Sequence, residues 1–96
     1  MILEVAHLRV DPTQTEAYEA AIAEAGPLIA SADGYLGHEF LRSDDEPGRY
    51  LLVVRWRSRA DHVDGFRGSE AYEQWRRLLH PFYDPIPEVS YFEPLG

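Results

Sequence analysis

At 96 residues the chain has room for one domain, spanning residues 1–96, and it is too short for a two-domain architecture such as a nucleotide-binding domain joined to a substrate domain. Its 45% apolar and 12% aromatic content is typical of a folded globule and excludes a disordered chain. A formal net charge of -8 makes nucleic acid and anionic lipid surfaces unfavourable partners.

The first strand and the first helix are predicted from alternation and capping. Residues 2–10 alternate as a strand does, and both faces of that strand are partly apolar, so we expect both to be covered. A helix is predicted to begin at Asp11, an acidic N-cap candidate followed by proline. Its apolar stripe starts at Tyr18 and continues past an expected kink at Gly26-Pro27, and the helix is expected to end near Asp33.

The rest of the chain predicts a hairpin, two helices and a last strand. Strands at residues 35–42 and 49–57 flank the turn-forming run SDDEPG, which indicates an antiparallel hairpin. After Ser58, a capping-box pattern and apolar residues at helical spacing predict a short helix and then a longer one. Residues 88–92 can form a final short strand.

The predicted order, β-α-β-β-α-β, is that of a ferredoxin-like α+β domain with helices on one face of an antiparallel sheet. Leu51, Val53 and Arg55 share one face of the third strand, whereas Leu52, Val54 and Trp56 share the other. Neither face suits bulk water. We therefore expect two sheets to pack face to face in a homodimeric α+β barrel.

The second half of the chain carries a pattern that resembles a known family. The pattern consists of Trp56, Ser58, His62, Gly65-Phe66-Arg67, Ser69, Tyr72, Trp75-Arg76 and Pro81-Phe82-Tyr83. It resembles the antibiotic biosynthesis monooxygenase (ABM) domain family, and the similarity covers essentially the whole chain. The resemblance implies dimeric α+β barrels with a ligand cavity between sheet and helices in each subunit.

The resemblance also implies a range of activities. Members of the family oxidise polycyclic aromatic substrates without metal or flavin, some degrade haem, and many have no established reaction. For the cofactor-free oxygenases it implies a tryptophan, tyrosines, an arginine and an asparagine around a phenolic substrate. Trp56, Tyr72 and several arginines match these roles, but the chain contains no asparagine.

Two histidines are candidate bases for such a reaction. His62 lies near Asp61 and Asp64 on the predicted short helix, where it is either a proton acceptor facing a cavity or a surface histidine paired with an acid. His38 is the alternative base. None of the four histidines shows His-x-x-x-His spacing and the chain has no cysteine, so we expect no metal site.

Each aromatic and cationic candidate has two possible interpretations, a structural role and a role in ligand binding. Trp56 is either a core anchor or part of the cavity wall. The stripe of Tyr72, Trp75 and Leu79 on the predicted longer helix is either core packing or a ligand contact, and Phe66 is a further candidate for the ligand site. Two arginines, Arg67 and Arg76, are candidates for holding an anion, with surface ion pairs as the alternative.

The resulting hypothesis is a cofactor-independent monooxygenase acting on a small aromatic or polyketide-like compound with O2. In it, His62 is the base, Arg67 stabilises the anion, Trp56 and Tyr72 position the ring, and His38, Phe66, Trp75 and Arg76 complete the ligand site. The alternatives are a noncatalytic ligand-binding or stress-associated dimer, and a cyclase or isomerase that does not use O2. With neither signal peptide nor membrane span in the sequence, we expect a cytoplasmic protein without a membrane partner.

Overall fold

The computed structural model describes residues 1–96 and has the order β-α-β-β-α-β. The elements are β1 (Ile2–Arg9), α1 (Thr15–Ala30), β2 (Tyr35–Arg42), β3 (Arg49–Trp56), α2 (Glu70–Leu79) and β4 (Glu88–Phe92). Short 3-10 helices at Pro12–Gln14 and His80–Phe82 flank α1 and α2, and a π-helix at Asp61–Phe66 connects β3 to α2. None of these helices has the length and apolar character that crossing a membrane requires.

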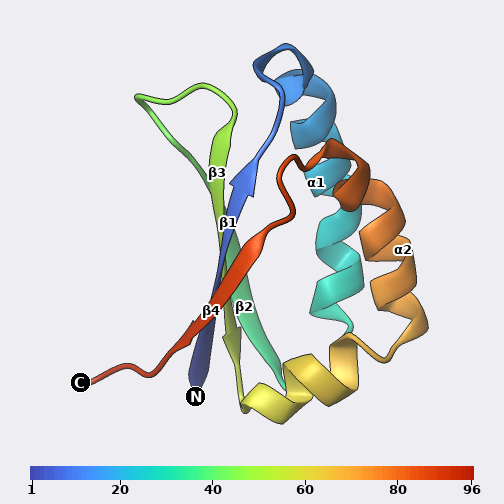
Figure 1. Cartoon of the computed structure of the whole chain (residues 1–96). Helices are drawn as coiled ribbons and strands as arrows, with labels where there is room; N and C mark the ends of the chain where they lie inside the picture. The colour runs from blue at the N-terminus through green and yellow to red at the C-terminus, as the bar shows by residue number, and fades with distance from the viewer.

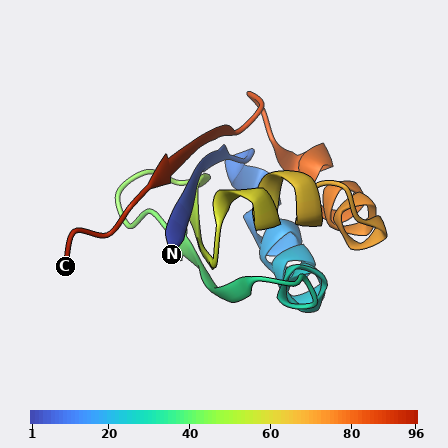
Figure 2. The same cartoon turned by 90° about the horizontal axis from the view of Figure 1, so that it is seen from below.

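The four strands form one antiparallel sheet in the order β2-β3-β1-β4. Both α-helices lie on the same side of this sheet (Figure 1 and Figure 2). The π-helix leads from the end of β3 to α2, at the bottom of the view in Figure 1. The predicted ferredoxin-like α+β fold is therefore confirmed.

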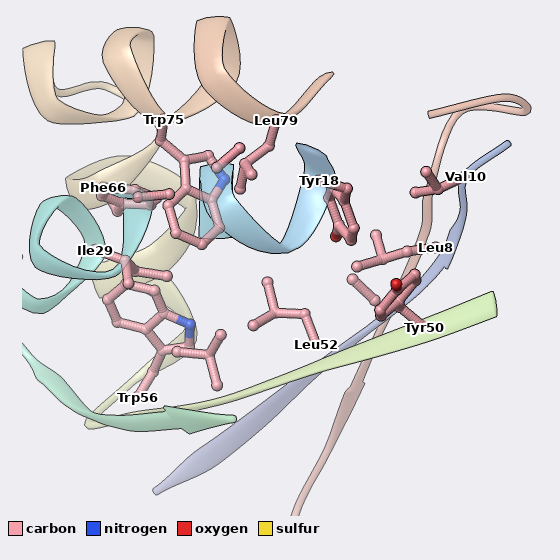
Figure 3. Packing of buried hydrophobic residues seen from close by; sticks show 14 residues of the cluster. Leu8, Val10, Tyr18, Ile29, Tyr50, Leu52, Trp56, Phe66, Trp75 and Leu79 are labelled. Carbon is pink, nitrogen blue, oxygen red and sulfur yellow. The ribbon is translucent and has the colours of Figure 1, made fainter. Parts of the chain in front are cut away.

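The inner face of the sheet, which the helices cover, holds the core. Alternate residues of β3 from Tyr50 to Trp56 are buried, and their partners in β1 from Glu4 to Leu8 are buried with them. Trp75 and Leu79 of α2 point towards this face, as Figure 3 shows. All but one of the buried β1 positions in this layer are apolar, and the exception is Glu4.

The outer face of the sheet has no element of this chain over it (Figure 2). Its centre, on β1 and β3, is apolar and comprises Leu3, Val5, Leu51 and Val53. Leu41 and Phe92 extend the apolar area onto the edge strands, and the same face also carries His7, Glu39, Arg55 and Glu88. Phe92 is 54% exposed and Leu41 44% exposed. A contiguous apolar face of this kind marks an interaction surface.

The start of the first helix follows its sequence signals in two steps, whereas its end differs from the prediction. Asp11 Oδ1 accepts from the backbone N–H of Thr13 at 2.9 Å and caps the 3-10 turn that precedes α1. Helix α1 then runs without interruption through Gly26 and Pro27 and ends at Ala30, a few residues before the expected boundary.

The turn before β3 requires a glycine. Gly48 has a φ of +84°, and a Cβ atom at this position would lie 2.1 Å from the carbonyl oxygen of Val10. The backbone N–H of Val10 donates to the carbonyl of Gly48 at 2.8 Å, so the two segments are in direct contact. Only glycine combines this backbone conformation with this close approach.

Candidate functional site

A cavity of about 230 Å³ lies between the inner face of the sheet and the helices. Its aromatic lining is Phe66, Tyr72, Trp75 and Tyr83, and its charged or titratable lining is Glu4, His62, Arg67 and His80. Aliphatic side chains of β1, β3, α1, β4 and the segment before β4 complete the wall. A mostly apolar cavity with a few converging polar groups is the usual form of a small-molecule site.

Three aromatic rings form one wall of the cavity, with the Phe66 ring nearly perpendicular to each of the other two. The Phe66 ring makes edge contacts with Tyr72, at 5.4 Å between centroids, and with Trp75, at 5.8 Å. Ser69 caps α2 by accepting from the backbone N–H of Tyr72 at 3.1 Å, which fixes the start of the helix that carries two of these rings. The wall is thus held by local packing and by a helix cap.

The π-helix between β3 and α2 brings polar groups to the cavity. The backbone N–H of Arg67 donates to the carbonyl of His62, five residues earlier, at 3.0 Å. The wider turn buries both His62 and Phe66 under the sheet and leaves Arg67 at the cavity. The sequence predicts a short helix here, and the structure forms it as a π-helix. Turns of this type often occur at functional sites.

A buried carboxyl group lies at the centre of the polar lining. Glu4 is 5% exposed, and its Oε1 accepts from the indole N–H of Trp56 at 2.9 Å. The Nε2 atom of His62 lies 3.3 Å from the same oxygen, and the imidazole stacks on the Trp56 indole with 5.2 Å between centroids. Both neighbours therefore hold one oxygen of the carboxyl group.

The second nitrogen of His62 also has a protein partner. Its Nδ1 lies 2.6 Å from the hydroxyl of Tyr91 on β4, over whose ring the Arg59 guanidinium sits at 4.1 Å. With Glu4 ionised, the consistent tautomer has Nε2–H donating to Glu4 and Nδ1 accepting from the Tyr91 hydroxyl. Both imidazole nitrogens are then occupied.

Burial acts on the two titratable groups of this network in opposite directions. Burial raises the pKa of Glu4, while the hydrogen bond from Trp56 and the charge of Arg67 act against this increase. Burial lowers the pKa of His62 to about 4, and the charge of Arg67 acts in the same direction. His62 is therefore neutral at pH 7, and the carboxyl group of Glu4 titrates above its ordinary range.

Arg67 differs from most arginines of this acidic chain because it makes no ion pair. The ion-paired arginines are Arg9, Arg42, Arg49, Arg55, Arg57 and Arg76, each within 4 Å of a carboxylate. Arg67 instead lines the cavity, and its charge reaches Glu4, His62 and Tyr91. An unpaired guanidinium at a cavity is available to an anionic ligand.

The structure brings together five of the candidate residues and leaves three outside the cavity lining. His62, Phe66, Arg67, Tyr72 and Trp75 all line the cavity. Trp56 is fully buried behind Glu4, and Arg76 is exposed and pairs with Glu73 at 2.9 Å. His38 packs close to Gly26 of α1 and hydrogen-bonds to the Tyr35 hydroxyl.

Sequence reasoning missed Glu4 and Tyr91. Glu4 had a signal, because it is the one charged residue on the face of the first strand that carries Ile2, Ala6, Leu8 and Val10. An acid on an otherwise buried strand face requires partners. Tyr91 had no such signal, because its pairing with His62 depends on how the last strand lies beside β1.

A family model for antibiotic biosynthesis monooxygenase matches residues 1–78. The chain is 39% identical over 93 residues to the uncharacterized protein YczJ of Bacillus subtilis (strain 168), covering 97% of this chain and 98% of that protein. Among solved structures it is similar to a Bordetella bronchiseptica protein provisionally named an antibiotic biosynthesis monooxygenase. That pair shares 34% identity with a TM-score of 0.93, over 99% of this chain and 97% of the other.

A more distant structural neighbour is SnoaB from Streptomyces nogalater, described as a cofactor-independent oxygenase. The TM-score is 0.82 at 16% identity, with 99% of this chain and 93% of SnoaB covered. At this identity the similarity shows the shared fold.

Proposed function

The chain belongs to the antibiotic biosynthesis monooxygenase family, and we propose on this premise that its cavity binds a small aromatic compound and oxygenates it with O2 without a cofactor. The observation that carries the proposal is the combination of an aromatic wall with a buried Glu4–His62 pair in one cavity. The wall supplies ring contacts and the pair supplies a place for a proton.

The cavity volume limits the size of the ligand. An apolar protein cavity of about 150 Å³ holds one benzene molecule. At about 230 Å³ the present cavity suits a substituted single ring or two fused rings. This favours a small aromatic compound over a larger polycyclic one.

The proposed chemistry begins with removal of a proton from a phenolic hydroxyl. The resulting aryloxide is electron-rich and reacts with O2 directly. A phenol and O2 together give a quinone and water. The four electrons that reduce O2 therefore all come from the substrate. In this proposal the Glu4–His62 pair receives the proton and Arg67 stabilises the developing negative charge. Phe66 and Tyr72 hold the ring, and Trp56 acts from behind the cavity by positioning Glu4.

We further propose that two chains assemble through the outer faces of their sheets. The apolar centre of that face supports a homodimer, because no element of the chain itself covers it. Each subunit would then enclose its own cavity on the side of the sheet that faces away from the partner.

A noncatalytic ligand-binding or stress-associated dimer is the second candidate function. It is favoured by the absence of asparagine from the chain, since the family resemblance implies an asparagine beside the substrate in cofactor-free oxygenases. A cyclase or isomerase on the same cavity would use the Glu4–His62 pair without consuming O2.

Oxygen consumption separates these functions. The purified protein is mixed with a series of naphthols in a closed oxygen electrode, and products formed under ¹⁸O2 are analysed by mass spectrometry. An oxygenase consumes O2 and places one ¹⁸O atom in the product. Binding of the naphthols without O2 uptake or product contradicts the oxygenase and supports the noncatalytic protein, whereas an unlabelled rearranged product supports the isomerase.

A further inference from the structure

We propose that Glu4 is the residue that takes the proton from the ligand, and that the ligand is a hydroxyarene that also carries an acid group paired with Arg67. This inference rests on the proposed function in that the ligand occupies the same cavity. It adds to that function a base that sequence reasoning did not find and a ligand with two defined polar groups.

The geometry favours Glu4 over His62 as the group that contacts the hydroxyl. Both nitrogens of His62 have protein partners, Glu4 on one side and Tyr91 on the other. By contrast, only Oε1 of Glu4 is engaged, by Trp56 and His62. Its Oε2 makes no hydrogen bond, and every fully buried polar side-chain atom of the chain has a partner. Because Glu4 lines the cavity, Oε2 is left open to the cavity space.

The proton step needs only the ligand and this carboxylate. The O–H bond of the hydroxyl breaks, the proton joins Oε2 of Glu4, and the ligand keeps the electron pair as an aryloxide. The N–H groups of Trp56 and His62 hold Oε1 and thereby aim Oε2. These two side chains are positioning residues in this step, and burial of the carboxylate makes it a stronger base than an exposed one.

The second polar group of the ligand follows from Arg67. Arg67 is an exposed residue that lines the cavity and makes no ion pair, although carboxylates outnumber arginines in this chain, 17 to 9. A carboxylate on the ligand would complete a charge-assisted pair there. With Glu4 also in the lining, the cavity suits a flat molecule with a hydroxyl directed towards Glu4 and an acid group directed towards Arg67.

Three fluorescent naphthalenes separate the two polar contacts. The probes are 6-hydroxy-2-naphthoate, 2-naphthoate, which lacks the hydroxyl, and 2-naphthol, which lacks the acid. Their dissociation constants are measured by titration under nitrogen for the wild-type protein and for Glu4→Gln and Arg67→Gln. The matched controls are Glu24→Gln and Arg77→Gln, which change exposed side chains without an ion pair and outside the cavity.

Each contact predicts its own loss of affinity. Wild type is expected to bind 6-hydroxy-2-naphthoate at least tenfold more tightly than either of the other two probes, as hydrogen bonds to charged groups allow. Glu4→Gln removes the preference for the hydroxyl and keeps the preference for the acid, and Arg67→Gln does the reverse. Both controls retain both preferences. Equal affinity of wild type for all three probes overturns the inference, and this comparison stands even where Glu4→Gln does not fold.

Proton transfer itself has a separate optical signal. A naphthol becomes a strong acid in its excited state, so the bound hydroxyl probe emits as a naphtholate when a carboxylate contacts its hydroxyl. We expect naphtholate emission from the wild-type complex and naphthol emission from the Glu4→Gln complex. Identical emission from the two complexes overturns the role of Glu4. Because these measurements exclude O2, their outcome is independent of whether the protein oxygenates its ligand.

Discussion

Acidification tests whether His62 stays neutral in its buried network, where it is 3% exposed. Its pKa is about 4 in the folded chain against 6.5 for an unperturbed histidine. Between pH 4 and pH 6.5 the unfolded chain binds a proton at His62 that the folded chain does not bind. Acid therefore favours unfolding in this range: the free energy of unfolding keeps its full value above pH 6.5 and decreases as the pH falls towards 4.

The magnitude follows from the size of this pKa difference. Between pH 7.5 and pH 5.5, protonation of the unfolded state at this one residue removes about 1.4 kcal/mol from the free energy of unfolding. For a chain of this length such a loss lowers Tm by about 5–10 °C. Ionised Glu4, 3.3 Å away, favours the charged imidazole, so about 1.4 kcal/mol is the upper value.

The assay is urea unfolding of wild type and His62→Gln at pH 7.5, 6.5 and 5.5, at one protein concentration. Wild type should lose more stability on acidification than the variant, by up to about 1.4 kcal/mol. Burial also lowers the pKa of His38 and His80, but both chains contain these histidines and their effect cancels in the comparison. An equal loss in the two proteins refutes a neutral His62.

Three further predictions concern the Trp56 indole that donates to Glu4, the turn at Gly48 and the outer face of the sheet. Trp56→Phe removes the N–H that donates to Glu4 and should lower the free energy of unfolding by about 2 kcal/mol in urea; an unchanged midpoint contradicts the bond. Gly48→Ala combines an unfavourable φ with a clash at the Val10 carbonyl and should lower the free energy of unfolding by about 2 kcal/mol or more. An unchanged free energy of unfolding contradicts the requirement for glycine in this turn. Val53→Arg places a charge in the apolar outer face and should give a monomer in light scattering; a persistent dimer contradicts pairing through that face.

The fold was predictable because each element carries a local signal. Alternation in the first strand and the turn run before Arg49 gave strands within one residue of those observed. Pro27 was a less certain signal, because it predicts a kink where α1 is continuous. The packing of the buried stripe that includes Ala25 and Ile29 outweighs the loss of one backbone donor at this proline.

The site was predictable only where its residues share one segment. Tyr72 and Trp75 lie three residues apart on α2, and Phe66 ends the π-helix just before it, so one short segment supplies the whole wall. The Glu4–His62 contact joins the first strand to the π-helix, so it depends on packing that no local pattern encodes. The structure therefore pairs His62, the expected base, with Glu4, an acid 58 positions earlier in the sequence.

Native mass spectrometry of the protein mixed with 6-hydroxy-2-naphthoate tests the central claim most directly, because one spectrum reports both the subunit number and the bound probe. A dimer of two 11.0 kDa chains that retains one probe molecule per chain is the predicted result. A monomer contradicts pairing of the outer faces, and a dimer that retains no probe contradicts a cavity built for a hydroxylated aromatic acid.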